Sequence, residues 1–198
     1  MFEALASVAG AENCDVDMVP TELPAYVTAQ PHVAADAFVA PNAVVVADVV
    51  VGSKSSIWFG CILRGDVQHI RVGARTNIQD GTIVHGTTNG QPALIGSGVT
   101  VGHAAVLHAC TIEDNAFIGI CACVLDGSVV SSGAMLAAGS VLTPGKRVAS
   151  GELWAGNPAR LLRRLTADEI AFIEISAERY VALAAHYRTA MPTLYSRR

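Results

Sequence analysis

Aliphatic residues recur at every sixth position over most of the chain. Each of these positions holds Val, Ile or Leu, and they fall into four runs: Val33, Val39, Val45, Val51, Ile57 and Leu63; Val72, Ile78 and Val84; Ile95, Val101 and Leu107; Ile112, Ile118, Val124, Val130, Leu136, Leu142 and Val148. This period fits neither an α-helix, which repeats every ~3.6 residues, nor a long alternating strand. It indicates short strands joined by tight corners.

Three such units close one triangular coil of eighteen residues, with the aliphatic side chains inside. Stacked coils bury one another's open edges, and their spacing is the distance between paired strands, ~4.8 Å. The sequence therefore predicts an all-β fold, a left-handed parallel β-helix of hexapeptide repeats, with about six coils over residues 31–150.

The two ends of the chain lack this period. We expect residues 1–30 to form an irregular leader, and residues 151–198 a connector and a C-terminal amphipathic helix. Thr166-Ala-Asp-Glu169 has the pattern of a capping box. Helical spacing then predicts one helix over about 167–189, ending before Pro192. Its apolar face should pack on the β-helix or on a neighbouring subunit, and consists of Ile170, Ile173, Ala177, Tyr180, Val181 and Ala184.

Composition narrows the class of protein. The 198 residues are 52% hydrophobic and 15% charged, with a formal net charge of −4, so the chain can bury a substantial core. No Lys/Arg-rich stretch is interleaved with aromatic residues, and we expect no nucleic-acid partner. No apolar run approaches the ~18 residues that a membrane span needs, and we expect no membrane association.

The cysteines and the first residues bear on location. Five cysteines without the spacing of a disulfide framework favour a reducing compartment. Residues 1–14 carry acidic residues and no basic n-region, so no secretory signal is indicated. We therefore expect a cytoplasmic protein. The Cys121-x-Cys123 pair is better explained by small residues on a tight coil than by metal binding.

Two histidines are placed together by the repeat. His85 directly follows inward Val84, and His108 directly follows inward Leu107, so alternation along a strand points both imidazoles outward. They are 23 residues apart, but the step from Val84 to the next inward position is five residues longer than usual. The remaining eighteen residues are one coil. Two imidazoles on backbones ~4.8 Å apart can converge on one metal ion.

The repeat places four more polar residues. Arg64 lies one coil before His85 on the same face. His103 lies on the preceding face, near a corner, where it can complete the metal site only if a neighbouring subunit packs against it. Gln79 lies one coil before the His103 segment, with Asn77 adjacent to it. The repeat places no second candidate ligand beside the other three histidines, and we assign no chemistry to them: His32, His69 and His186.

These motifs closely resemble the gamma-class carbonic anhydrases and their relatives. The resemblance covers about residues 31–190, and the matching segments are 57–66, 75–81, His85, 101–103, 107–108, 154–159 and the final helix. It implies a homotrimer with a metal ion at each subunit interface, held by His85 and His108 of one chain and His103 of the next. The metal in this family is zinc, with iron or cobalt as alternatives.

The resemblance also assigns roles to polar residues near the metal. Arg64 and Asp66 look like the family's ion pair between subunits. Asn77 and Gln79 look like its polar residues beside the metal-bound solvent. Two features depart from the most active members, which carry a glutamate at the position of Val67 and a proton-shuttling glutamate in an acidic loop. The corresponding loop here, residues 86–92, has no acidic residue.

Three functions are compatible with this pattern. The first is a metal-dependent carbonic anhydrase, a lyase in which hydroxide generated at the metal attacks CO2 and yields bicarbonate. The second is an acyl-CoA thioesterase or acyltransferase on the same scaffold, although an acyltransferase typically needs one histidine base and not three converging ones. The third is a non-catalytic assembly module, against which the complete set of candidate ligands argues.

Overall fold

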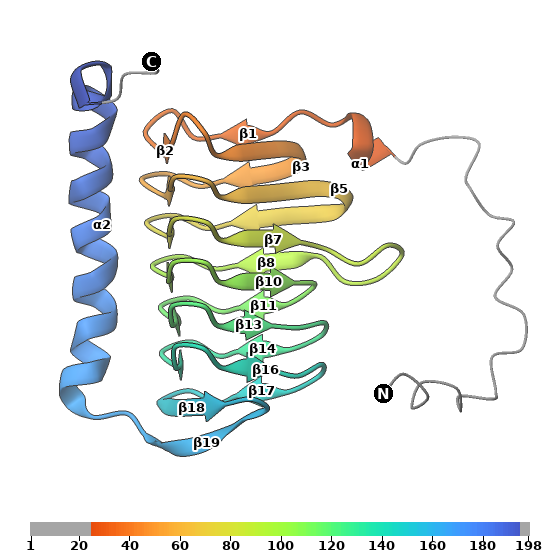
Figure 1. The fold of residues 1–198 in the computed structure, drawn as a ribbon, viewed down its shortest axis with the longest axis vertical. Coiled ribbons are helices and arrows are strands. Elements are labelled where there is room, and N and C mark those ends of the chain that lie inside the picture. The colour runs from red at the N-terminus through yellow and green to blue at the C-terminus, as the bar shows by residue number, and fades with distance from the viewer. Residues whose placement is uncertain (1–24, 195–198) are drawn as a thin grey trace, which may run out of the picture.

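The computed structural model describes residues 25–194, and their side chains except those of Tyr26 and residues 191–194. The chain forms a column of stacked coils with one long helix along its side (Figure 1). The expected irregular leader falls mostly on residues 1–24, outside the described residues. The described part begins with the single helical turn α1 (Ala25–Thr28).

One wall of the column is an eight-stranded sheet. Its strands lie one per coil and are all parallel except the last. In spatial order they are β2 (Phe38–Val39), β4 (Ser56–Ile57), β6 (Asn77–Ile78), β9 (Thr100–Val101), β12 (Phe117–Ile118), β15 (Met135–Leu136), β18 (Glu152–Gly156) and the antiparallel β19 (Ala159–Arg164).

The other two walls belong to one eleven-stranded sheet that bends around a corner. The long strands β3 (Val44–Val51) and β5 (Ile62–Val72) run through both walls. The second wall continues with β7 (Ile83–His85), β10 (Val106–His108), β13 (Cys123–Val124) and β16 (Val141–Leu142). The third contains β1 (His32–Val33), β8 (Ala93–Ile95), β11 (Thr111–Ile112), β14 (Val129–Val130) and β17 (Arg147–Val148).

This arrangement confirms the left-handed parallel β-helix, with about seven turns where about six were expected. The additional turn arises because β18 pairs in parallel with β15 and so continues the first wall beyond residue 150. β19 then folds back on β18 as an antiparallel hairpin. The segment that the sequence presented only as a connector therefore adds strands to the column.

The aliphatic side chains of the six-residue period form the core of the column. Every aliphatic position of the period from Val51 to Val148 is buried. The three earlier positions, Val33, Val39 and Val45, are partly buried and pack against the same core. They lie in the first described coils, where no described coil covers them from above. The hydrophobic free energy of folding is thus gained along one narrow, continuous interior.

Tight corners require residues with positive φ. Glycine occupies five consecutive corners at the same six-residue interval, Gly127, Gly133, Gly139, Gly145 and Gly151, with φ between 64° and 70°. Glycine adopts this left-handed conformation without steric cost. Cys121 occupies the preceding corner of the same series, with φ 58°, and its side chain is exposed. Its place is explained by the corner, in agreement with the simpler interpretation of Cys121-x-Cys123.

Helix α2 (Ala167–Leu194) runs back along the first wall (Figure 1). The predicted capping box is present: the Glu169 backbone N–H donates to the Thr166 hydroxyl (3.2 Å), and the Thr166 N–H donates to the Glu169 carboxylate (2.9 Å). The helix packs through Ile173, Ala177 and Ala184, which are buried. Its apolar face therefore packs on its own chain.

Two expectations for this helix were wrong. Ile170 is 52% exposed, and the buried positions of the helix begin at Ile173. The helix also continues past Pro192 to Leu194. Proline cannot donate a backbone hydrogen bond, which weakens a helix at that position. Only two helical residues follow Pro192, so the missing donor affects only the last turn. Between residues 25 and 194, no helix is both long and apolar enough to cross a bilayer.

Candidate functional site

The strand register places Arg64, His85 and His108 in one row along the second wall. In β5 and β7, Arg64 lies opposite His85, and in β7 and β10, His85 lies opposite His108. The centroids of the two imidazole rings are 5.5 Å apart. The row is the one that the eighteen-residue subtraction predicted.

Alternation along the strands turns both imidazoles outward, as predicted. Val84 and Leu107, which precede them, are fully buried. The His85 side chain is 17% exposed and the His108 side chain 35%. The two rings are therefore held by a rigid wall and still accessible from outside the column.

A carboxylate that the sequence reading missed fixes the orientation of His108. Nδ1 of His108 lies 2.7 Å from Oδ1 of Asp126, and the Thr87 hydroxyl donates to the other oxygen. The Thr87 hydrogen bond, aided by His108, holds the pKa of Asp126 below its ordinary value despite partial burial. Because an ionised carboxylate only accepts hydrogen bonds, the proton of the imidazole is on Nδ1. Nε2 of His108 is then free to bind a metal.

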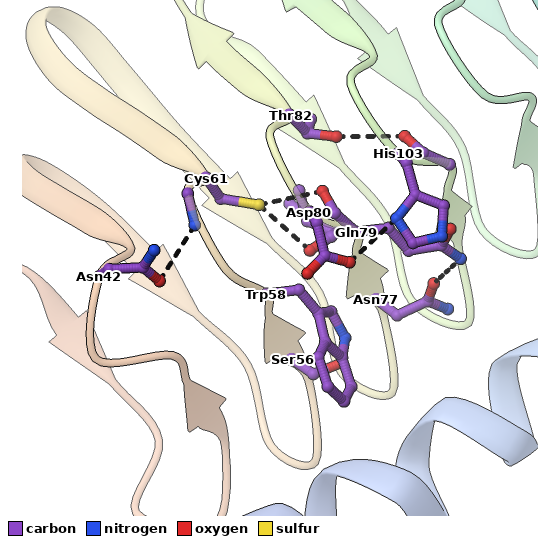
Figure 2. Close-up of polar contacts among 12 residues, drawn as sticks. Asn42, Ser56, Trp58, Cys61, Asn77, Gln79, Asp80, Thr82 and His103 are labelled. Atoms are coloured by element: carbon purple, nitrogen blue, oxygen red, sulfur yellow. Dashed lines mark hydrogen bonds and ion pairs between the residues drawn. The ribbon is translucent and has the colours of Figure 1, made fainter. Parts of the chain in front are cut away.

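His103 has the same arrangement on the adjacent wall. It lies two residues after β9, just before the corner at Ala104, where φ is 56°. Its Nδ1 lies 2.9 Å from Oδ2 of Asp80, so Nε2 is again the free nitrogen (Figure 2). The His103 side chain is 45% exposed. The predicted position, on the preceding face near a corner, is the one observed.

Asn77 and Gln79 are both buried and form one polar group next to His103 (Figure 2). Nε2 of Gln79 donates to Oδ1 of Asn77 (3.0 Å), and Nδ2 of Asn77 donates to the Thr100 hydroxyl (2.9 Å). These bonds fix both amides. The carbonyl oxygen of Gln79 is left to accept a hydrogen bond from a small molecule.

Arg64 and Asp66 pair with each other within the chain, where the resemblance implied a pair between subunits. Arg64 donates to both oxygens of Asp66, at 2.9 and 2.7 Å. Asp66 also lies 3.0 Å from Nε2 of His85. Burial raises the pKa of Asp66, but the bonds from Arg64 and His85 outweigh it, and the pKa lies below its ordinary value. Asp66 is thus an anion that contacts a candidate ligand.

The missed residues, Asp80 and Asp126, carry a signal in the sequence. Asp126 follows His108 by eighteen residues, one coil, and Asp80 precedes His103 by 23, one coil plus the five-residue insertion. The subtraction that aligned the histidines would therefore have found both carboxylates. Metal-binding histidines usually donate their other ring N–H to a carboxylate or carbonyl.

Within one chain the three histidines do not meet. Among the described residues, no group of three His, Cys, Asp or Glu side chains is close enough to hold a metal ion. His85 and His108 form a pair, and His103 lies around the corner on another wall.

An apolar row runs beside the histidine row. Val44, Ile62 and Ile83 lie opposite one another in β3, β5 and β7, and are 45%, 38% and 44% exposed. The register continues this row with Val106 and Cys123 in the next two coils. Exposed large aliphatic residues in a continuous row are typical of a surface that another protein chain covers.

The chain is similar to curated gamma carbonic anhydrases. It is 55% identical over 159 residues to gamma carbonic anhydrase 2 of Arabidopsis thaliana, covering 78% of this chain and 57% of the relative. The corresponding values for gamma carbonic anhydrase 3 are 52% over 164 residues, 80% and 64%. The chain thus spans less than two thirds of the length of these relatives.

These relatives contradict the expected cytoplasmic location, because they are named as mitochondrial proteins. The argument from cysteines failed because unpaired thiols are compatible with any reducing compartment.

The chain is also similar to solved structures of hexapeptide-repeat proteins. No protein-family model matches it. A hexapeptide transferase family protein from Anaplasma phagocytophilum is 52% identical with a TM-score of 0.77, and the match covers 79% of this chain and 92% of that one. A putative acetyltransferase from Bacillus cereus is 36% identical with a TM-score of 0.81, covering 83% and 95%. The chain belongs to the gamma-class carbonic anhydrase family of hexapeptide-repeat, left-handed β-helix proteins.

Proposed function

We propose that the chain is a metal-dependent carbonic anhydrase that interconverts CO2 and bicarbonate at sites shared between the subunits of a homotrimer. The observation that carries the proposal is the pairing of His85 with His108 on adjacent coils, with ring centroids 5.5 Å apart. The relatives named gamma carbonic anhydrases support the reaction class.

The homotrimer is proposed because one chain supplies an incomplete ligand set. His85 and His108 share a wall, and His103, with its free Nε2, lies on another. A second copy whose His103 wall faces this histidine row would bring three imidazoles together. The exposed apolar row of Val44, Ile62 and Ile83 gives that copy a hydrophobic surface to cover beside the site.

The residues present fit a zinc ion, with iron or cobalt as alternatives. Imidazole nitrogen is a preferred ligand for all of them, and three histidines leave one coordination position open for catalysis. Two of the three rings are oriented by carboxylates, Asp80 and Asp126. When bound, such an ion acts as a Lewis acid that makes water nucleophilic near neutral pH.

The polar residues around the ligands bind and orient the small substrates. The Gln79 carbonyl oxygen would accept a hydrogen bond from the attacking water, with Asn77 holding the amide in place. Arg64, which is 47% exposed, would approach the neighbouring chain, and Asp66 would exchange its partner within the chain for one across the interface. No acidic residue in the loop at 86–92 is available to carry away the proton that CO2 hydration releases.

An acyl-CoA thioesterase or acyltransferase on the same scaffold is a second candidate, and the solved relatives described as a hexapeptide transferase family protein and a putative acetyltransferase fit it. A nucleophilic water beside Gln79 would attack a thioester carbonyl by the same geometry. Turnover of short acyl-CoA esters without CO2 hydration would favour this candidate over the first.

The test is elemental analysis of anaerobically purified protein, paired with stopped-flow CO2 hydration on the same sample. The proposal predicts about one metal ion per chain and hydration that a chelator abolishes. Hydration that persists in metal-free trimers would refute it.

A further inference from the structure

Helix α2 does not close completely on the first wall. A cavity of about 520 Å³ remains between them, within the usual range for small-molecule pockets. Apolar side chains from both sides line it, among them Phe117, Met135 and Leu153 from the column and Phe172 from the helix. None of the three candidate metal ligands lines the cavity, and Gln79 is the one residue that it shares with the polar group beside His103.

The cavity is elongated along the column. Its lining extends from Gln79, directly after β6, to Leu153 in β18, and β9, β12 and β15 lie in between. Four steps between coils at ~4.8 Å each give a length of ~19 Å. An unbranched chain fits such a shape better than a compact ring system does.

Charge is confined to one end of the cavity. Arg179 is the one charged residue in its lining, and no ion pair or hydrogen bond involves its guanidinium among residues 25–194. Ser176 bonds to Thr100 in β9, and the Tyr180 ring packs on Trp58 next to β4, 5.4 Å between centroids. Arg179 therefore lies between the levels of β9 and β4, which is the level of Gln79. The opposite end, at Leu153, is apolar.

We propose that this cavity binds a linear, apolar monocarboxylate, a fatty-acid-like molecule. Its carboxylate would pair with Arg179 at the Gln79 end, and its alkyl chain would extend along Phe117 and Met135 towards Leu153. An unpaired guanidinium at the mouth of an apolar channel is complementary to an anionic head with an apolar tail. The cavity shares Gln79 with the proposed hydration site, but binding of the monocarboxylate through Arg179 requires neither a metal nor the hydration of CO2.

The test is calorimetric titration of the purified full-length protein with dodecanoate below its micelle concentration, with and without EDTA. One saturable site per chain is expected in both conditions. Arg179→Gln should weaken binding at least tenfold, while Arg188→Gln, on the same helix but away from the cavity, should leave the affinity unchanged. Dodecyltrimethylammonium, with a similar tail and the opposite charge, should show no saturable binding.

Ala137→Phe provides a second test, because it fills the cavity near its apolar end and leaves Arg179 in place. This variant should bind dodecanoate at least tenfold more weakly and hexanoate almost as wild type does. The circular dichroism spectrum of each variant shows whether it has folded. Equal binding of the cationic detergent, binding that EDTA abolishes, or unchanged dodecanoate affinity in folded Arg179→Gln would overturn the proposal.

Discussion

Each candidate metal ligand in this chain has a carboxylate within hydrogen-bond distance. Asp126 contacts His108, Asp80 contacts His103, and Asp66 contacts His85. A carboxylate at Nδ1, as in His108 and His103, selects the tautomer that leaves Nε2 for the metal, and its removal typically costs 10–100-fold in metal affinity. In His85 the carboxylate contacts Nε2 instead. The arrangement distinguishes these histidines from His32, which is exposed and whose imidazole forms no hydrogen bond or ion pair among residues 25–194.

Asp126→Asn tests this orienting role. An amide can donate to Nδ1 and so favour the wrong tautomer, and we expect metal affinity to fall roughly 10–100-fold while the fold is retained. Competition with a fluorescent zinc chelator measures the affinity. Wild-type affinity in the variant would show that Asp126 does not position His108.

His108→Ala removes a ligand outright. Two remaining imidazoles hold zinc far more weakly, so metal content and CO2 hydration should both be lost. His32→Ala is the matched control, with both properties expected to be as in wild type. The proposed site is wrong if His108→Ala retains a full complement of metal.

The dependence of kcat on buffer concentration tests whether the protein lacks its own proton carrier. Because Val67 and the loop at 86–92 provide no carboxylate, proton transfer should limit turnover, and added imidazole buffer should raise kcat severalfold with kcat/KM unchanged. Stopped-flow assays at constant ionic strength measure this. A kcat independent of buffer concentration would indicate a carrier within the protein.

Among the structural elements, the coil follows from the sequence almost completely. The inward positions from Val51 to Val148 are all buried as the period predicts, because only aliphatic side chains fill a narrow column. The ends of the column are predicted less well from the sequence. The β18–β19 hairpin lies where the period ends, at Trp154, and its pairing depends on the last coil already being in place. The period carries no information about such an end.

Leu142→Ala tests the energetic role of the inward positions. Leu142 is fully buried, and its truncation leaves a cavity that neighbouring coils cannot fill, so we expect a loss of about 2–5 kcal/mol in the free energy of unfolding. Exposed Leu162, 61% accessible, is the control, with a change within about 0.5 kcal/mol. Urea denaturation measures both, and similar losses in the two variants would contradict the assignment of the core.

The capping box predicts an acid-dependent contribution to stability. Hydrogen bonds from Arg163 and from the Thr166 backbone lower the pKa of Glu169 from 4.5 to about 2. A lowered folded-state pKa stabilises the fold above pH ~4.5, and the contribution is lost as pH falls towards 2. Glu169→Gln should therefore have a lower Tm than wild type at pH 7.

The same substitution should lose its effect in acid. The difference in Tm between wild type and Glu169→Gln should shrink as pH falls from 4.5 to 2, because wild type then loses the same charge. Glu174→Gln, at an exposed position on the same helix, provides the control. A difference in Tm that does not change over this range would show that Glu169 is not the titrating group.

At the scale of the whole molecule, the sequence predicts the walls but not what covers them. The repeat places His85 and His108 in a row and His103 around a corner, yet the orientation of a neighbouring chain depends on surface packing that no period encodes. Asp66 illustrates the limit: within one chain it pairs with Arg64, and the sequence alone does not distinguish this pairing from one between subunits. Location was likewise beyond what composition could predict.

Mixed trimers test most directly whether the metal site is shared between subunits. His103→Ala and His108→Ala chains, carrying different affinity tags, would be co-expressed and purified through both tags. Neither variant alone should bind metal. Each mixed trimer has one interface that joins an intact His85–His108 pair to an intact His103, so we predict about one third of the wild-type metal content and activity. Mixed trimers without metal or activity would contradict a site built from two chains.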